Sequence, residues 1–153
     1  MAMLRSPLLL FIVFSIGDAG DTCQYGWTNF GSRCNKFIFF QETWITVERN
    51  RIALHANLAS VHSEQENDFL LGLLPSSTTQ CWLGNQDAVE EGQWLWSDGT
   101  PYDYSNWCSG EPNNLNVENC GELNWAVRKQ SSDHCWNDES CSNSMGYVCA
   151  KDL

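Results

Sequence analysis

The eight cysteines of this 153-residue chain restrict its fold more than any other feature. Their number is even and all of them follow an apolar leader, so we expect a small secreted domain held by disulfides. Eight cysteines allow 105 pairings, and spacing alone does not choose among them. The sequence contains neither a Cys-x-x-Cys pair nor a zinc-type cysteine–histidine cluster. The cysteines are Cys23, Cys34, Cys81, Cys108, Cys120, Cys135, Cys141 and Cys149.

The leader has the pattern of a secretory signal peptide. Arg5 precedes a run of nine residues, 8–16, that is apolar apart from Ser15, and the small residues Gly17 and Ala19 follow it. A run of that length is far shorter than the roughly 20 residues that cross a bilayer as a helix. We therefore expect residues 1–19 to be removed and residues 20–153 to form one secreted, extracellular domain without membrane insertion.

The net charge of −11 narrows the range of partners. Such an acidic surface argues against binding to nucleic acid or to anionic lipid. It is compatible with cation binding, because hard cations need carboxylate oxygens. The oligomeric state is left open, and a homo-oligomer is compatible with the sequence.

The first half of the chain predicts a hairpin and two helices. Residues 27–40 are aromatic and β-prone, which indicates a hairpin, and residues 41–54 have helical periodicity. A capping box at Ser63 and Glu66 predicts a second helix over residues 64–73. The inward face of the first helix is formed by Trp44, Val47, Arg51 and Leu54. Because Arg51 is a cation, we expect its guanidinium to be exposed or paired with a carboxylate.

The second half predicts short strands and one long loop. Residues 97–119 are rich in Gly, Pro, Asn, Asp and Ser, and a loop of that length in a compact domain is usually functional. Helices followed by strands indicate an α+β fold. The strand candidates are residues 81–84, 93–96, 121–127 and 145–150.

Three motifs in and after the long loop supply oxygen donors. They are Glu111-Pro112-Asn113, Glu118 before Cys120, and Trp136-Asn137-Asp138 before Cys141. Each tripeptide alone would be read as a surface turn or a strand end. Together they give three carboxylates and two amide carbonyls, and calcium takes 6–8 oxygen ligands. Five or so side-chain oxygens leave positions that two vicinal sugar hydroxyls can fill.

With these motifs the mature chain resembles the C-type lectin domain family from Cys23 to Lys151. Trp82-Leu83-Gly84 matches the family's core signature, and the three oxygen-donor motifs match its calcium and sugar motifs. The resemblance implies an α+β fold with two helices, two small antiparallel sheets, disulfide staples and a long calcium-binding loop. It is strongest to small secreted fish lectins, a group that includes antifreeze relatives.

The resemblance also assigns a calcium and sugar site. Glu111, Asn113, Glu118, Asn137 and Asp138 would ligate the principal Ca2+ and hold the sugar. The Glu111–Pro112 bond would be cis. The Glu-Pro-Asn order is the family's signature for mannose-type sugars, whereas Gln-Pro-Asp marks the galactose type.

A second, auxiliary calcium site is a weaker implication. Its family positions are occupied here by Asp87, Glu91, Asn114 and Glu118, with Asn119 alongside. Amides stand at two positions where stronger sites have carboxylates, and fewer charged ligands bind calcium more weakly. A solvated acidic loop is the alternative.

The family pattern pairs three sets of cysteines: Cys23–Cys34, Cys108–Cys135 and Cys120–Cys141. The family's remaining staple joins a helix cysteine to Cys149, but Arg51 stands at that helix position. Cys81 and Cys149 are left, and three outcomes are open. They bond to each other, one stays free, or one joins a second chain.

Other residues indicate no enzyme. His55, His62 and His134 accompany no nucleophile motif, and we expect them on the surface or in loops. The paired carboxylates of a glycosidase are an alternative, but metal-bound carboxylates are poor general acids. Among the aromatic residues, Trp107 and Tyr104 lie in the loop and are candidates for stacking on a sugar, whereas the strand patterns predict a core position for Trp82, Trp94, Trp96 and Trp125.

The sequence therefore predicts a secreted, calcium-dependent lectin for mannose-type glycans, with microbial surfaces as its targets in innate defence. The alternative is a calcium-binding type II antifreeze protein on the same fold. A regular Thr- or Ala-rich surface, as ice recognition favours, is missing from the loop sequence. A lectin-like domain without a ligand is a third reading, and the intact donor set argues against it.

Overall fold

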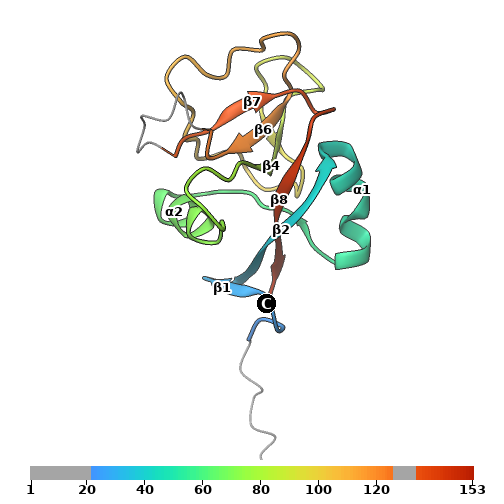
Figure 1. The fold of residues 1–153 in the computed structure, drawn as a ribbon, viewed down its shortest axis with the longest axis vertical. Coiled ribbons are helices and arrows are strands. Elements are labelled where there is room, and N and C mark those ends of the chain that lie inside the picture. The colour runs from blue at the N-terminus through green and yellow to red at the C-terminus, as the bar shows by residue number, and fades with distance from the viewer. Residues whose placement is uncertain (1–21, 126–133) are drawn as a thin grey trace, which may run out of the picture.

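The structure is a computed structural model that describes residues 22–125 and 134–153. The predicted signal peptide lies outside these residues. Two helices, α1 (Trp44–Leu54) and α2 (Glu64–Gly72), lie on either side of the long strands (Figure 1). The strands are β1 (Thr28–Phe30), β2 (Arg33–Thr43), β3 (Asn57–Leu58), β4 (Cys81–Gln86), β5 (Leu95–Trp96), β6 (Cys120–Leu123), β7 (Asn137–Glu139) and β8 (Ser144–Asp152).

The strands form one mixed sheet in the order β1-β2-β8-β4-β6-β7, with β3 on β8 and β5 on β4. The expected antiparallel groups are both present. A short parallel pairing of β4 with β8 joins them, with Cys81 opposite Gly146 and Trp82 opposite Tyr147. The predicted α+β class is confirmed, and this junction makes a single sheet of the two that we expected.

Both helices are close to their predicted positions. Ser63 caps α2 by accepting a hydrogen bond from the N–H of Glu66 at 3.2 Å. The Glu66 carboxylate reaches back to the N–H of His62 at 2.8 Å and pairs with Arg33. The first helix starts at residue 44 rather than 41, because residues 42 and 43 continue the pairing of β2 with β8.

Buried side chains form one cluster on each face of the sheet. The face toward α2 holds Leu70, Leu83 and Val148, and the face toward α1 holds Val47 and Leu58. Three of the four tryptophans expected in the core are buried, and Trp125 is half-buried. Neither α1 nor α2 is long and apolar enough to cross a membrane.

Three disulfides staple the domain, and they are the pairs that the family pattern implies. They join Cys23 to Cys34, Cys108 to Cys135, and Cys120 to Cys141. The first ties the segment before β1 to β2, and the others hold the region around β6 and β7.

A bond between Cys81 and Cys149, one of the three outcomes left open, is contradicted, because both thiols are free and buried. The parallel register explains why they do not meet. Cys81 shares a face with Gly146 and belongs to the cluster under α2, whereas Cys149 belongs to the cluster under α1. The sheet separates the two thiols, and burial raises the pKa of Cys149 to about 12.

Arg51 behaves as predicted. Its guanidinium donates from Nη1 to Oδ1 of Asn57 at 2.8 Å and pairs with the Glu48 carboxylate at 3.0 Å. The side chain is 39% exposed, so the charge does not lie in a dry core.

Candidate functional site

The long loop between β5 and β6 leaves the sheet at the end opposite the C-terminus (Figure 1). Its start is held by Asp98, which accepts hydrogen bonds from Ser60 Oγ at 2.5 Å and from the N–H of Thr100 at 2.9 Å. Its middle and end are held by Cys108 and Cys120 through their disulfides. The loop is therefore fixed at several points along its length.

Asp138 on β7 is the residue around which the predicted donors gather. Its two carboxylate oxygens accept hydrogen bonds from the N–H groups of Asn113 at 2.9 Å and Asn114 at 2.6 Å. The Glu111–Pro112 bond that leads into this segment is cis, as predicted. The loop is thus folded back onto the strand, with Glu111 and Asn113 on either side of the proline.

Glu118 completes a tight turn with Asn113. Oε2 of Glu118 and Oδ1 of Asn113 both accept the N–H of Leu115, at 3.1 Å and 2.8 Å. Burial, followed by the charges of Asp138 and Glu139, raises the pKa of Glu118 to about 7. A carboxylate whose pKa is raised in this way gains from a neighbouring cation.

Glu111 lies beside Asp138 and has a buried carboxylate oxygen, Oε2, without a hydrogen-bond partner. Burial first, and then the hydrogen-bond contact and charge of Asp138, raise the pKa of Glu111 above its ordinary value. A buried acceptor without a donor is costly. This oxygen is therefore suited to a ligand.

Asn137 is placed by a residue that the sequence did not single out. Its Nδ2 donates to Oε2 of Glu122 at 3.2 Å, and Glu122 lies opposite it on β6. Burial is the largest cause that raises the pKa of Glu122 to about 7. Only the pairing of β6 with β7 brings the two side chains together, so no local signal in the sequence could have found Glu122.

The auxiliary set is contiguous with the principal one. Asp87 is buried and accepts a hydrogen bond from the N–H of Gly92 at 2.8 Å. With its side-chain nitrogen oriented toward Asp87, Asn119 donates to the Asp87 carboxylate at 3.2 Å. Glu91 lies beside Asp87 and Asp138. Desolvation first, and then the charges of these two carboxylates, raise the pKa of Glu91. Asn114 accepts the N–H of Glu118 at 2.9 Å.

The donor chemistry of this cluster fits a hard cation. The set offers carboxylate and amide oxygens, one of them orphaned, and the carboxylates raise one another's pKa. Among residues 22–125 and 134–153, no three His, Cys, Asp or Glu side chains lie close enough together to hold a metal ion by themselves. Oxygens of Asp138 and Glu118 accept backbone N–H groups, and each retains a further lone pair.

The aromatic and histidine candidates have structural contacts. Trp107 packs against Trp94 with ring centroids 4.6 Å apart, and Tyr104 meets Trp136 edge-on at 5.8 Å. Both residues are half-buried, and their stacking on a sugar stays a prediction. His55 lies just beyond α1, His62 bonds to Asp103 and Ser60, and His134 bonds to Asn124.

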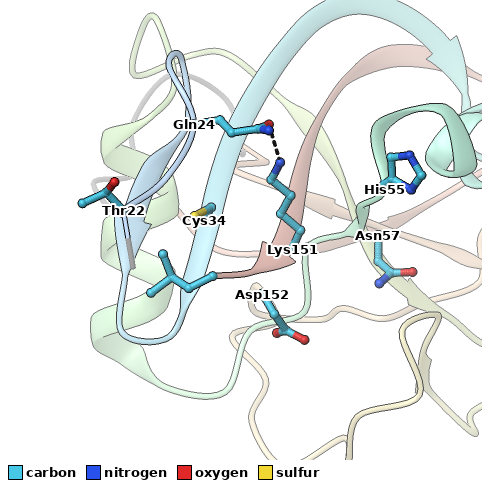
Figure 2. Close-up of a pocket in the computed structure, with 8 residues that line it drawn as sticks. Thr22, Gln24, Cys34, His55, Asn57, Lys151 and Asp152 are labelled. Carbon is cyan, nitrogen blue, oxygen red and sulfur yellow. Dashed lines mark hydrogen bonds between the residues drawn. The ribbon is translucent and has the colours of Figure 1, made fainter. Parts of the chain in front are cut away.

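A pocket of about 490 Å³ lies at the other end of the sheet, near the C-terminus (Figure 2). Lys151 crosses one side of it and donates to Oε1 of Gln24 at 2.8 Å, and His55 and Asn57 face it from the α1 side. None of the predicted ligands lines this pocket. The donor cluster around Asp138 remains the candidate site.

Comparison with known proteins identifies the family of the domain. The Lectin C-type domain family model matches residues 41–151. Ladderlectin of Oncorhynchus mykiss is 44% identical over 82% of this chain, and the match spans 65% of ladderlectin's own length. The galactose-specific lectin nattectin of Thalassophryne nattereri is 35% identical, with 95% of each chain covered.

Solved structures give the same result. The herring type II antifreeze protein superposes with a TM-score of 0.77 at 32% identity, covering 86% of this chain and 99% of the other. The carbohydrate-recognition domain of cow CD23, solved in the presence of a GlcNAc2Man3 oligosaccharide, gives 0.74 at 34% identity, covering 86% and 97%. The chain belongs to the C-type lectin domain family, whose members bind ligands rather than catalyse reactions.

Proposed function

We propose that this domain is a secreted, calcium-dependent lectin for mannose-type sugars. The principal Ca2+ would be held by Glu111, Asn113, Glu118, Asn137 and Asp138. The observation that carries the proposal is the folding of the loop onto Asp138, whose carboxylate accepts both Asn113 and Asn114 N–H groups. Two motifs that are distant in sequence are thereby joined by hydrogen bonds, which supports their action as one site.

Each part of the donor set has a distinct task toward a sugar. Bound calcium would draw two vicinal hydroxyl oxygens into its open coordination positions. The carboxylates of Glu111 and Glu118 would accept the hydroxyl protons, and the amides of Asn113 and Asn137 would donate to the hydroxyl oxygens. Both hydrogen-bonding capacities of each hydroxyl are then satisfied, which makes a neutral ligand specific.

Mannose-type specificity follows from the Glu-Pro-Asn order of the loop. Nattectin is described as galactose-specific, and the CD23 structure was obtained with a mannose-containing oligosaccharide, so relatives span both classes. Microbial surface glycans in innate defence are the targets we propose, since free sugar binds such sites weakly and arrays bind by avidity.

An auxiliary calcium at Asp87, Glu91, Asn114 and Glu118 is a second element of the proposal. The N–H of Asp87 already donates to the carbonyl of Asn119 at 3.1 Å, so this ion would reinforce an existing contact between the two loops. We expect it to bind weakly, because Asn114 and Asn119 are amides at positions where carboxylates would strengthen a calcium site, and because it shares Glu118 with the principal ion.

Retention on mannose-agarose tests the proposal. The protein should bind in calcium, elute with chelator, and elute progressively as the pH falls below about 7, where Glu118 takes up a proton and calcium must displace it. Asp138→Asn should abolish retention, whereas Glu90→Gln, on the exposed loop near Asp87, should leave it intact. Retention in excess chelator would refute calcium dependence.

Ice binding is the second candidate, because the herring type II antifreeze protein shares the fold at 32% identity. It predicts thermal hysteresis from the protein without retention on sugar resins. Measuring both properties on one preparation separates the two functions.

A further inference from the structure

Two apolar side chains stand in solvent at the edge of the proposed sugar site. Leu115 is 62% exposed and Val117 is 67% exposed. Both lie in the short turn between Asn113 and Glu118. The charged residues near them are acidic and include Glu111, Glu118, Asp138 and Glu139. Two exposed apolar side chains are unusual in such polar surroundings.

Backbone hydrogen bonds fix this turn. The N–H of Leu115 is shared between Asn113 Oδ1 at 2.8 Å and Glu118 Oε2 at 3.1 Å, and the N–H of Val117 donates to the carbonyl of Asn114 at 3.2 Å. Turning either side chain inward would break bonds that hold the donor oxygens. The backbone that carries the two side chains is thus fixed to the site.

The conformation of Val117 is unfavourable for its residue type. Its φ is +70°, in the left-handed region that β-branched residues rarely adopt. Asn114 and Asn116, at +50° and +58°, are in the same region, but asparagine tolerates it. Glycine or asparagine would therefore suit position 117 better, and burial does not compensate the strain. Such strain at an exposed position points to a role in binding.

We infer that Leu115 and Val117 form an apolar subsite for the hydrophobic aglycon of a glycoside, such as the alkyl chain of a glycolipid. The inference rests on the proposed lectin function, because the sugar would be anchored at the adjacent donor oxygens. Sugar hydroxyls gain little from apolar side chains, whereas an aglycon removes apolar surface from water. A second copy of this chain is disfavoured as the occupant, since two acidic ends would repel each other.

The test compares two probes on the mature protein in calcium: methyl α-mannoside and octyl α-mannoside, the latter below its micelle concentration. We expect octyl mannoside to bind about ten-fold more tightly, the change given by burying about 60 Å² of apolar surface. In the double variant Leu115→Asn with Val117→Asn, the ratio of the two affinities should fall to about one. The ratio cancels any change that both probes share.

Ile45→Asn is the matched control, because Ile45 is an exposed apolar residue on α1, away from the loop (Figure 1). It should retain the wild-type ratio. Asparagine suits the left-handed conformation, so the double variant should unfold at no lower temperature than the wild type, which keeps the comparison valid.

The outcomes separate the two proposals. Equal affinities of wild-type protein for the two probes overturn the subsite while leaving the lectin function intact. Octyl mannoside binding that persists in chelator also overturns it, because the chain would then bind without the sugar. If neither mannoside binds in calcium, the lectin function fails and the subsite fails with it.

Discussion

Nδ2 of Asn137 donates a hydrogen bond to Oε2 of Glu122 at 3.2 Å, and both side chains are almost completely buried. The bond fixes which way the Asn137 amide faces. The bond uses one of the two N–H groups of Nδ2, so the carbonyl oxygen Oδ1 and the second N–H are left for other partners. Glu122 is therefore a positioning residue for a proposed calcium ligand.

The first prediction is that Glu122→Leu lowers calcium affinity by about ten-fold or more, the usual effect of losing the partner that orients a metal ligand. Glu122→Gln retains an acceptor and should bind calcium nearly as the wild type does. Calorimetric titration with calcium measures both. Glu139→Gln is the control, since it removes a neighbouring acidic charge without touching Asn137. Equal affinities of the Leu variant and the wild type would contradict the role.

The second prediction concerns pH in the absence of calcium. Burial raises the pKa of Glu122 in the folded state to about 7, from 4.5 for an unperturbed glutamate. The ionised group therefore destabilises the fold above about pH 7, and the penalty disappears as the folded protein takes up the proton between pH 7 and 4.5. In chelator, Glu122→Gln should unfold at a higher temperature than the wild type at pH 8 and at a similar one near pH 5. A difference independent of pH would show that Glu122 is not the group responsible.

Much of the fold could be predicted because its signals are local. The capping box at Ser63 and the apolar periodicity before residue 54 placed both helices within three residues of their observed limits. The disulfides followed from the family pattern. The fate of Cys81 and Cys149 could not be predicted, because it depends on the register of β4 against β8, which neither strand encodes alone.

The sequence predicted the candidate donor residues of the site but not the contacts that hold them in position. The three motifs name Glu111, Asn113 and Asp138 because their chemistry is visible in sequence. Asn85 illustrates a contact that is not visible in the sequence. It is buried in β4, and a Cβ atom at Gly121 would lie 1.9 Å from its Oδ1. A glycine at position 121 is thus required by a contact between strands that are distant in sequence.

The third prediction uses the missing staple. Arg51 occupies the helix position from which the family's cysteine bonds to Cys149, and its partner Asn57 precedes Leu58, the residue paired with Cys149. Arg51→Cys should form that disulfide and stabilise the domain by about 2–4 kcal/mol. Thiol titration of the denatured protein gives a direct count: two in the wild type, and one in the variant if the bond forms, because the added cysteine takes Cys149 with it. Three free thiols would mean that the bond does not form. Arg51→Ser, which loses the same polar contacts without a thiol, is the reference for stability.

The last prediction tests what sets the sugar preference. Exchanging Glu111→Gln together with Asn113→Asp keeps the number of oxygen donors and the total charge, so calcium should still bind. The exchange reverses the side of the ion that offers an acceptor-only carboxylate and the side that offers an amide donor.

Hydroxyl pairs with the mannose arrangement would then meet the wrong donor order, leaving polar groups unsatisfied at about 1–3 kcal/mol each. That is enough for a ten-fold or larger change in preference, since about 1.4 kcal/mol corresponds to ten-fold. Competition by mannose and galactose for one immobilised glycan, with calcium titrated separately, measures both effects. The double variant should lose mannose and move toward galactose while its calcium affinity stays within a few-fold of the wild type. A wild-type preference for galactose would show that the order of Glu111 and Asn113 does not determine specificity in this loop.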